Sequence, residues 1–426
     1  MEVLRYGERG GKVRLLQLAL KRAGENINID GIFGRRTLAA VQRFQTQNGL
    51  SADGIVGRLT WAALFPYLSG YTLHIVAPGE SLFSIAKRYD TTLEAIAIAN
   101  ELSDPDYIEP GKTLKIPLPF PVVSVQLPYD SFYTALVLEG LAARYPFLSV
   151  RSFGNSVMGR ELLLASVGVG GVAVGYNASH HANEWITTPL NLLFLEDYLK
   201  AIAYQTDIGG VSASELYSKT VLHMAPLVNP DGVDLVTGAI GEGDSYYEQA
   251  RALASYYPSI PFPSGWKANI RGVDLNLGYP AGWETAKRIK FMQGYTRPGP
   301  RDYVGTAPLA EPENQAMAAL TVEQDYALTI AYHTQGGEIY WQFLDYRPEG
   351  AERIGEAMAA ASGYRLAETP YNSSFAGYKD WFIQTYIRPG YTIEAGRGQN
   401  PLPLSQLEQM YRDNLGVFVA GLNLSS

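Results

Sequence analysis

Two side chains that could hold a metal ion lie three positions apart, soon after a short apolar run. The run, residues 172–176, predicts a buried strand, and the apolar spacing of residues 187–204 predicts a helix. Between these elements stand His181 and Glu184. Imidazole and carboxylate groups are suitable ligands for Zn²⁺, and a catalytic zinc takes three protein ligands and leaves one position open for water. The pair therefore supplies two ligands and requires a third.

The remaining ligand can come from the few other histidines of the chain. His180 is adjacent to His181, and neighbours in an extended segment point in opposite directions, so only one of the two should face the metal. We select His181 because of its spacing from Glu184. His333 follows a predicted buried strand, where α/β sheets place their sites, and is our candidate for the third ligand. His223 lies inside an apolar run and is predicted to be a core residue.

Glu394 is the candidate general base. It ends the apolar segment 391–394, which predicts a short strand. Partial burial at that point would raise the pKa of its carboxyl group toward the range that proton transfer needs. The local sequence is also typical of a surface glutamate at a strand end, so the assignment depends on the rest of the chain.

Composition excludes several classes of function. The 426 residues are 46% hydrophobic and 18% charged, which is enough apolar material for several globular domains. The net charge of −8 without a basic cluster argues against nucleic acid as a partner. Cysteine is absent, which excludes thiolate metal sites. We expect no membrane span and see no secretory signal pattern, so location stays open between the cell interior, a sporulating compartment and the wall.

An internal repeat organises residues 1–68. Residues 30–37 recur as residues 53–60, and each copy predicts a Gly-containing turn followed by a helix N-cap threonine, Thr37 or Thr60. Helical spacing of apolar residues completes a small three-helix unit. The unit resembles the peptidoglycan-binding domain 1 family at Val13, Leu16-Gln17, Leu20, Ala40-Val41, Phe44-Gln45, Gly49-Leu50 and Thr60-Trp61.

Residues 70–117 predict a βααβ unit. An alternating strand at 71–76 is followed by two helices, the first capped by Ser81, and by a returning strand at 113–117. The proline-rich residues 118–124 predict a semi-rigid linker. The unit resembles the LysM domain, a family that binds N-acetylglucosamine polymers, at His74, Gly79-Glu80-Ser81-Leu82, Ile85-Ala86, Leu93, Ala99-Asn100, Ile108, Pro110-Gly111, Leu114 and Ile116-Pro117.

Residues 125–426 predict one large α/β domain. Short apolar strands, typical of a sheet buried on both faces, alternate with helices. The predicted helices are 130–145, 187–204, 312–324, 349–362 and 404–422, and the strands are 161–167, 172–176, 221–227, 327–331 and 391–394. The predicted fold class is therefore multidomain: a three-helix unit, a βααβ unit, and a large α/β domain with a mixed, mostly buried sheet flanked by helices.

The large domain resembles the zinc carboxypeptidase family. The matching positions are the His-x-x-Glu pair, His333, Glu394 and the segments 229–232 and 272–276. Their order and spacing carry more information than His-x-x-Glu alone. The resemblance implies one Zn²⁺ per chain, with His181, Glu184 and His333 as ligands and Glu394 as the catalytic base.

The resemblance also implies an oxyanion-stabilising cation and a substrate-binding set. Lys267, nine residues before Asn276, stands where relatives with a short segment here have an arginine, and Arg271 is the alternative. Family carboxypeptidases clamp the terminal carboxylate of the substrate with an arginine at the position of Leu277, and leucine cannot form that ion pair. Arg397 could supply a replacement cation or be an ordinary solvated loop residue. We expect substrate binding by Asn276, Arg271, Thr334, Arg397 and Leu277.

Two wall-binding units before such a peptidase indicate peptidoglycan as substrate. The arrangement, including the motif at 266–284, is similar to the γ-D-glutamyl-L-diamino acid peptidases of spore-forming bacteria. We therefore expect hydrolysis of the bond between D-glutamate and meso-diaminopimelate or lysine, with glycan strands and stem peptides as partners and with tethering that raises the local concentration of stem peptide. The alternatives are a zinc carboxypeptidase of other specificity and a wall-binding protein that has lost activity. The sequence leaves the oligomeric state open.

Overall fold

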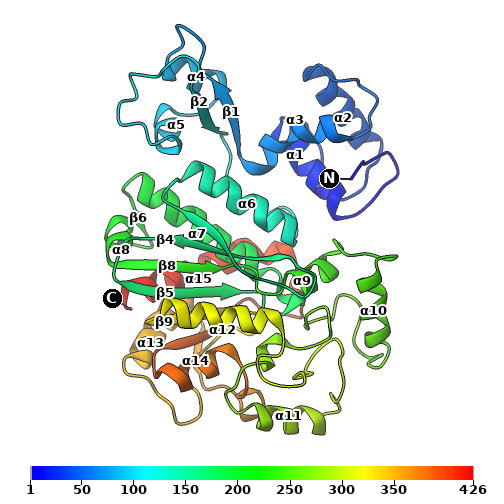
Figure 1. Cartoon of the computed structure of the whole chain (residues 1–426), viewed down its shortest axis with the longest axis vertical. Helices are drawn as coiled ribbons and strands as arrows, with labels where there is room; N and C mark the ends of the chain where they lie inside the picture. The colour runs from blue at the N-terminus through cyan, green and yellow to red at the C-terminus, as the bar shows by residue number, and fades with distance from the viewer. Residues whose placement is uncertain (1, 426) are drawn as a thin grey trace. The chain divides into compact units, whose positions relative to one another are not determined.

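The computed structural model describes residues 2–425, which divide into two compact units (Figure 1). The first comprises the chain up to residue 128 together with residues 135–148, and the second comprises residues 129–134 and the chain from residue 149 onward. Helix α6 (Ser131–Arg144) contributes residues to both units. Among residues 2–425, no helix has the length and apolarity that crossing a bilayer requires.

The sequence repeat near the N-terminus is also a structural repeat. Its helices are α1 (Gly11–Arg22), α2 (Arg35–Gln47) and α3 (Arg58–Ser69). A buried glutamine holds the turn of each copy: Gln17 Nε2 donates to Asp30 Oδ1 at 2.7 Å, and Gln45 Nε2 donates to Asp53 Oδ1 at 3.1 Å. The two turns therefore have the same polar support, which explains why the same residues recur.

The predicted threonine N-caps are wrong. The N-cap residues of α2 and α3 are Gly34 and Gly57. Thr37 and Thr60 lie in the first turns of the helices, and each hydroxyl accepts a hydrogen bond from the buried glutamine of its copy at 3.1 Å. The hydroxyls thus join the turn to the helix instead of capping it.

The predicted βααβ unit is confirmed. It consists of β1 (Tyr71–Ile75), α4 (Leu82–Arg88), α5 (Leu93–Ala99) and β2 (Thr113–Pro117), with the two strands antiparallel. Ser81 is the N-cap of α4, and its side chain and that of Ser84 exchange hydrogen bonds with each other's backbone N–H. His74 bonds Glu80 at 2.7 Å and Tyr89 at 3.1 Å, as expected for a structural residue.

The second unit is built on an eight-stranded mixed sheet. Its strands are β3 (Ser149–Asn155), β4 (Glu161–Val167), β5 (Val172–Ala178), β8 (Thr220–Ala225), β9 (Leu328–His333), β10 (Glu338–Tyr340), β11 (Arg365–Ala367) and β12 (Gly390–Glu394). They are ordered β11-β10-β12-β9-β5-β8-β4-β3. The central strands β12, β9, β5 and β8 are mutually parallel. Their carboxyl ends therefore share one edge of the sheet.

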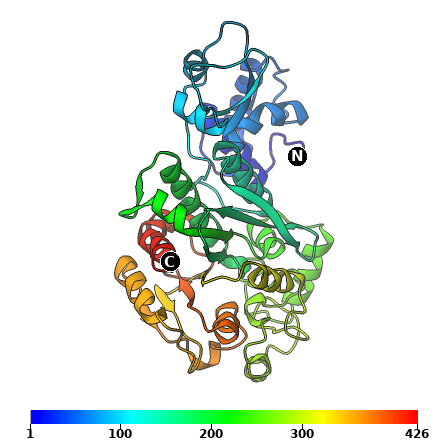
Figure 2. The same cartoon turned by 60° about the vertical axis from the view of Figure 1, so that its left-hand side comes forward.

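Helices pack on both faces of this sheet (Figures 1 and 2). Among them are α7 (Thr187–Ala203), α12 (Pro312–Gln324), α13 (Ala351–Ser362), α14 (Tyr378–Tyr386) and α15 (Leu407–Asn423). On one face, Phe418 of α15 stacks on Tyr332 of β9 and on Phe194 of α7, with ring centroids 4.6 and 4.5 Å apart. The predicted mixed sheet flanked by helices is confirmed, and most residues of its central strands are buried.

The remaining elements of this unit lie in the segments that connect these strands and helices. They are η1 (Ala182–Glu184), α8 (Ala213–Lys219), α9 (Pro230–Thr237), α10 (Ser245–Ala254), η2 (Leu275–Leu277), α11 (Trp283–Met292), η3 (Tyr371–Ser373) and η4 (Leu404–Gln406), with a small hairpin of β6 (Asp207–Ile208) and β7 (Val211–Ser212). The predicted strand 221–227 is too long, because Pro226 has no N–H to donate and β8 ends at Ala225.

We predict that Glu313 makes the stability of the second unit depend on pH. This residue is fully buried in the first turn of α12, and burial raises the pKa of its carboxyl group from 4.5 to about 7. The folded state then holds the proton more tightly than the unfolded state, so stability falls as pH rises from about 4.5 to about 7.

Glutamine mimics the protonated carboxyl and does not titrate. The free energy of unfolding of Glu313→Gln, relative to that of wild type, should therefore increase by on the order of 2–3 kcal/mol as the pH rises from 5 to 8. Urea denaturation of the zinc-loaded chain at a series of pH values measures this difference. Glu323→Gln, at an exposed position of the same helix, should show no such trend. A gain that stays constant with pH would contradict the assignment.

Candidate metal centre and active site

The predicted site residues come from neighbouring strand ends at one edge of the sheet. His333 is the last residue of β9, and Glu394 is the last residue of β12 beside it. Strand β5 lies on the other side of β9 and leads through a tight turn to His181 and Glu184. Because parallel strands end together, residues that are far apart in sequence meet there.

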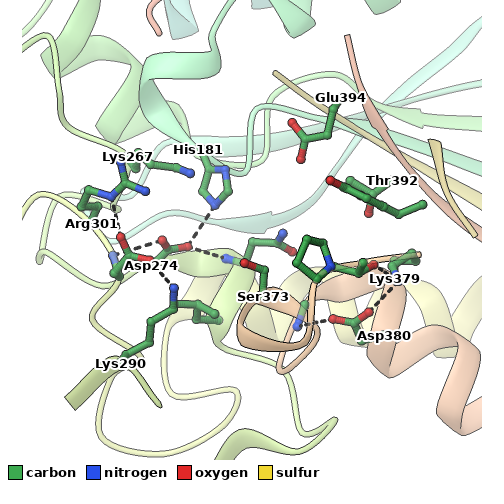
Figure 3. Close-up of a pocket in the computed structure, with 17 residues that line it drawn as sticks. His181, Lys267, Asp274, Lys290, Arg301, Ser373, Lys379, Asp380, Thr392 and Glu394 are labelled. Carbon is green, nitrogen blue, oxygen red and sulfur yellow. Dashed lines mark hydrogen bonds and ion pairs between the residues drawn. The ribbon is translucent and has the colours of Figure 1, made fainter. Parts of the chain in front are cut away.

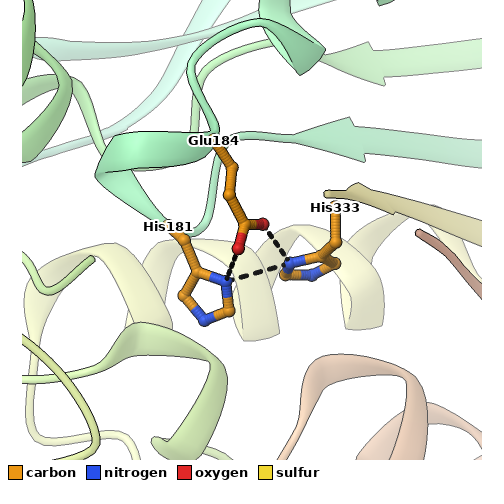
Figure 4. A group of neighbouring side chains, drawn as sticks. All are labelled: His181, Glu184 and His333. Carbon is orange, nitrogen blue, oxygen red and sulfur yellow. Dashed lines mark hydrogen bonds and ion pairs between the residues drawn. The ribbon is translucent and has the colours of Figure 1, made fainter. Parts of the chain in front are cut away.

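Three side chains converge in this place (Figure 4). His181 Nδ1 lies 3.0 Å from Glu184 Oε1, His333 Nδ1 lies 2.9 Å from Glu184 Oε2, and the two Nδ1 atoms are 3.1 Å apart. All three residues are buried, and one ligand atom from each lies within 4.8 Å of the others. Within residues 2–425 they are the group of histidine and acidic side chains arranged to hold a metal ion.

The hydrogen bonds around His181 fit a bound divalent cation. Its Nε2 lies 3.0 Å from Asp274 Oδ1, and a carboxylate there favours the tautomer in which Nε2 carries the proton and donates a hydrogen bond to it. The lone pair of Nδ1 is then directed at Glu184 and His333, which also present lone pairs. A bound cation would stabilise such a set of buried acceptors, and two imidazoles with one carboxylate form a typical zinc ligand set.

The two other histidines of this domain have structural roles. His180 is fully buried, bonds Tyr279 Oη at 3.1 Å and stacks on the ring of His333. His223 lies on β8 and bonds Ser166 Oγ at 2.9 Å, as a core residue should. Burial lowers the pKa of His223 to about 4, so it is uncharged at neutral pH.

Glu394 stands beside the three convergent side chains with the properties of a base. It is opposite His333 in the β12–β9 ladder and borders a cavity that His181 also lines. Burial and then repulsion by Glu184 raise the pKa of Glu394 to about 8, although Lys267 and His181 act in the opposite direction. A carboxylate of this kind accepts a proton more readily than one in water.

Lys267 and Arg271, the two candidate cations, occupy different surroundings. Lys267 Nζ lies 3.5 Å from Glu184 Oε1 and lines the cavity. Burial lowers the pKa of Lys267, but the charges of Glu184 and Asp274 outweigh this effect, so the pKa is raised and the ammonium stays charged. Arg271 is largely exposed and lies 3.6 Å from Glu311, outside the lining of the cavity.

The cavity beside Glu394 has a volume of about 240 Å³ (Figure 3). Asn276 and Leu277 line it, so the position where relatives clamp a carboxylate is occupied here by an apolar side chain. Asn276 Oδ1 also accepts a hydrogen bond from the Tyr378 N–H at 3.0 Å, which holds the first turn of α14 in place.

Thr334 and Arg397 lie elsewhere around the site. The Thr334 N–H donates to Glu184 Oε2 at 3.2 Å, and its hydroxyl donates to Asn400 at 2.7 Å, so this residue orients the ligand carboxylate. Arg397 is exposed and lines a shallow hollow with Gln335 and Arg365, not the cavity that contains Leu277. The structure therefore separates Arg397 from the carboxylate-clamp position.

Sequence reasoning did not assign roles to several residues of the site. Asp274 lies in the segment 272–276, which matches the family. Its place in that segment, two residues before Asn276, was the available signal for its contact with His181. Tyr340, Lys379 and Asp380 also line the cavity, but nothing in the local sequence distinguishes them from surface residues.

Family models match all three parts of the chain. Residues 135–416 match the model described as zinc carboxypeptidase, residues 9–64 match a putative peptidoglycan binding domain, and residues 74–117 match the LysM domain. The fold of the large domain is also found in carboxypeptidase A from Helicoverpa armigera, with a TM-score of 0.54 at 19% identity over 71% of this chain and 74% of that chain.

Two bacterial proteins are similar to most of the chain. Gamma-D-glutamyl-L-diamino acid endopeptidase 1 of Lysinibacillus sphaericus is 44% identical over 303 residues, which is 71% of this chain and 74% of the relative. Uncharacterized protein YqgT of Bacillus subtilis (strain 168) is 38% identical over 291 residues, which is 68% of this chain and 76% of that protein. With its zinc cofactor and its peptidoglycan-binding modules, the chain belongs to the zinc carboxypeptidase family of metallopeptidases.

Proposed function

We propose that this enzyme hydrolyses the γ-D-glutamyl–diamino acid bond of peptidoglycan stem peptides. The observation that carries the proposal is the 44% identity to a γ-D-glutamyl-L-diamino acid endopeptidase over 303 residues. Leu277 in the cavity wall supports it, because an apolar residue there removes the requirement for a terminal carboxylate. The N-terminal modules would hold the glycan and raise the local concentration of stem peptide.

Each proposed catalytic residue has a defined task. His181, Glu184 and His333 would hold the zinc ion, which would supply Lewis-acid polarisation of a carbonyl and lower the pKa of water. Glu394 accepts a proton from the attacking water and donates it to the leaving amine, for which its raised pKa is suited. Lys267 places its ammonium where negative charge develops on the carbonyl oxygen. Asp274 fixes the ring orientation of His181 and does not touch the substrate.

Defined muropeptides test the function directly. The zinc-loaded chain should convert L-Ala-γ-D-Glu-diaminopimelate and the matching tetrapeptide to L-Ala-D-Glu, as detected by mass spectrometry. A chelator should abolish the reaction, and added zinc should restore it, since the site depends on the cation. Release of D-alanine alone from the tetrapeptide would contradict the proposal and favour a carboxypeptidase of other specificity.

We predict that Glu394→Gln removes catalysis and retains zinc. General base catalysis contributes about 10²- to 10⁴-fold, so kcat should fall by that factor. Metal analysis should still find one zinc per chain, because Glu394 is not among the convergent ligand residues. Glu408→Gln, at an exposed position of α15, is the matched control and should keep full activity. Equal loss of zinc and activity would instead assign Glu394 to the metal.

We predict that Lys267→Met lowers kcat by about 10²- to 10³-fold with little change in KM, since its ammonium acts on charge that develops in the transition state. Lys267→Arg should restore part of kcat because it keeps the positive charge. Lys200→Met, at an exposed position of α7, controls for loss of a lysine. A larger loss in Arg271→Met would transfer the role to that residue.

A further inference from the structure

Asn269 is a fully buried side chain that none of the catalytic steps above uses. It lies two residues after Lys267, in the segment between α10 and η2 that also carries Asp274. An amide side chain has two donors on its nitrogen and an acceptor oxygen, and burying it is costly unless these groups are hydrogen-bonded. The partners of this amide therefore show what Asn269 holds in place.

The side-chain oxygen of Asn269 shapes its own loop. Oδ1 accepts hydrogen bonds from the N–H groups of Arg271 and Val273, both at 3.1 Å. Main-chain bonds close the same turn, since the Asn269 N–H donates to the Val273 carbonyl at 2.8 Å and the Gly272 N–H donates to the Asn269 carbonyl at 3.0 Å. All these bonds stay within residues 269–273, so they give the loop its shape but not its place in the domain.

The side-chain nitrogen of Asn269 attaches this loop to helix α12. Nδ2 donates to Glu311 Oε2 at 2.8 Å and to Glu313 Oε2 at 3.4 Å. Both glutamates are buried; Glu311 is the N-cap residue of α12, and Glu313 lies in its first turn. The other oxygen of Glu313 accepts from the Val157 N–H at 3.1 Å, which ties the start of the helix to the segment after β3. Asn269 thus joins a loop to a fixed part of the fold.

Both polar groups of the Asn269 side chain have partners, which is not general among the buried asparagines of this chain. Among residues 2–425, five others have a buried side-chain oxygen that accepts no hydrogen bond: Asn177, Asn183, Asn191, Asn314 and Asn414. A buried polar network in which every group is satisfied rigidifies the segments that it joins. The contacts of Asn269 therefore fix where the loop lies relative to α12.

The position of the Lys267 ammonium depends on this loop. Its Nζ makes no hydrogen bond with any residue between 2 and 425, and its 3.5 Å separation from Glu184 Oε1 is longer than a normal hydrogen bond. Main-chain bonds join Lys267 to Pro300 in a loop and to Ala182 in the short η1. The lysine stem is flexible, so a shift of the loop would carry the ammonium away from the site.

We propose that Asn269 is a positioning residue, which sets the place of the Lys267 ammonium by attaching its loop to α12. This role rests on the proposed function, in which Lys267 stabilises the negative charge that develops on the carbonyl oxygen of the substrate. Such stabilisation requires that the cation is already in place when the charge develops. A displacement of about 1 Å can cost about 10²-fold in rate even when the substituted residue is far from the reacting atoms.

Asn269→Asp separates the shape of the loop from its attachment. The carboxylate keeps an oxygen for the two loop N–H groups, but it replaces the donating amide and faces the carboxyl groups of Glu311 and Glu313. With the full-length zinc-loaded chain and L-Ala-γ-D-Glu-diaminopimelate, kcat should fall by about 10- to 100-fold with little change in KM. Asn155→Asp, at an exposed position, is the control and should keep the wild-type kcat. Loss of zinc in parallel with activity would overturn the proposal, because Asn269 would then act on the metal site.

A second substitution exchanges donor and acceptor across the same contact. Adding Glu311→Gln to Asn269→Asp places an amide at position 311 that can donate to the carboxylate at position 269. This double variant should recover most of the lost kcat, and absence of any recovery would overturn the proposal. Glu311→Ala removes the acceptor on α12 and leaves the hydrogen bonds within the loop intact. It should also lower kcat, so the proposal stays testable if Asn269→Asp folds poorly, and an unchanged kcat in Glu311→Ala contradicts it.

A double-mutant cycle tests whether the effect passes through Lys267. Residues that act through the same group have effects that do not add. Asn269→Asp should therefore lower kcat strongly in the wild-type background and no further in the Lys267→Met background. Losses that add in full would overturn the proposal, because they would show that Asn269 supports the site by another route.

Crystal structures of the zinc-loaded variants provide a readout that does not need turnover. In Asn269→Asp, Lys267 Nζ should lie farther from Glu184 Oε1 than the 3.5 Å of the wild-type chain, and Glu311→Gln in the same chain should bring it back. If wild type hydrolyses no muropeptide, the proposed function fails, and this displacement of the ammonium still supports the positioning role. An unchanged position of Nζ in Asn269→Asp overturns that role while leaving the proposed function intact.

Discussion

Three groups with lone pairs directed at one another occupy one buried space, and the site depends on the resulting need for a cation. Two imidazole nitrogens and a carboxylate would repel each other in a medium of low polarity, so a divalent ion between them makes the arrangement favourable. The fold creates the geometry by ending β5 and β9 side by side. His181 and His333, separated by 152 positions in the chain, thereby bring their Nδ1 atoms within 3.1 Å.

A loop held against the ligand segment supplies the surrounding charges. Its Lys267 carbonyl accepts from the Ala182 N–H at 2.9 Å. Asn229 joins the same two segments, because its side-chain amide donates to the His180 carbonyl at 3.1 Å and to the Ala268 carbonyl at 3.0 Å. The segment around Asn229 thus has a structural role, which is to join these two segments, and takes no part in the reaction. The bridge keeps Lys267 beside the Glu184 carboxylate. A mobile lysine would instead lose conformational entropy in each catalytic cycle.

Local patterns predicted the elements that carry strong periodicity or clear end signals. The bounds of α12 and β4 agree with the predicted ranges, since a proline begins the first and the second is a compact apolar run. Strands β10 and β11 were not predicted, because three residues carry too little pattern to recognise. His333 was a candidate ligand because it follows a predicted buried strand, and the family resemblance then grouped it with His181. Lys379 and Asp380 could not be predicted as cavity residues, since charges in a first helical turn are ordinarily exposed.

The positions of the charged side chains in the cavity explain how members of one fold family can bind different groups of their substrates. An arginine at the position of Leu277 would bind the carboxylate next to the leaving amine, and such a carboxylate is free only in a terminal residue. With leucine there, no ion pair can form at this position, so that group can equally be an amide. The buried charges lie instead with Lys379 and Asp380 at the end of the cavity (Figure 3).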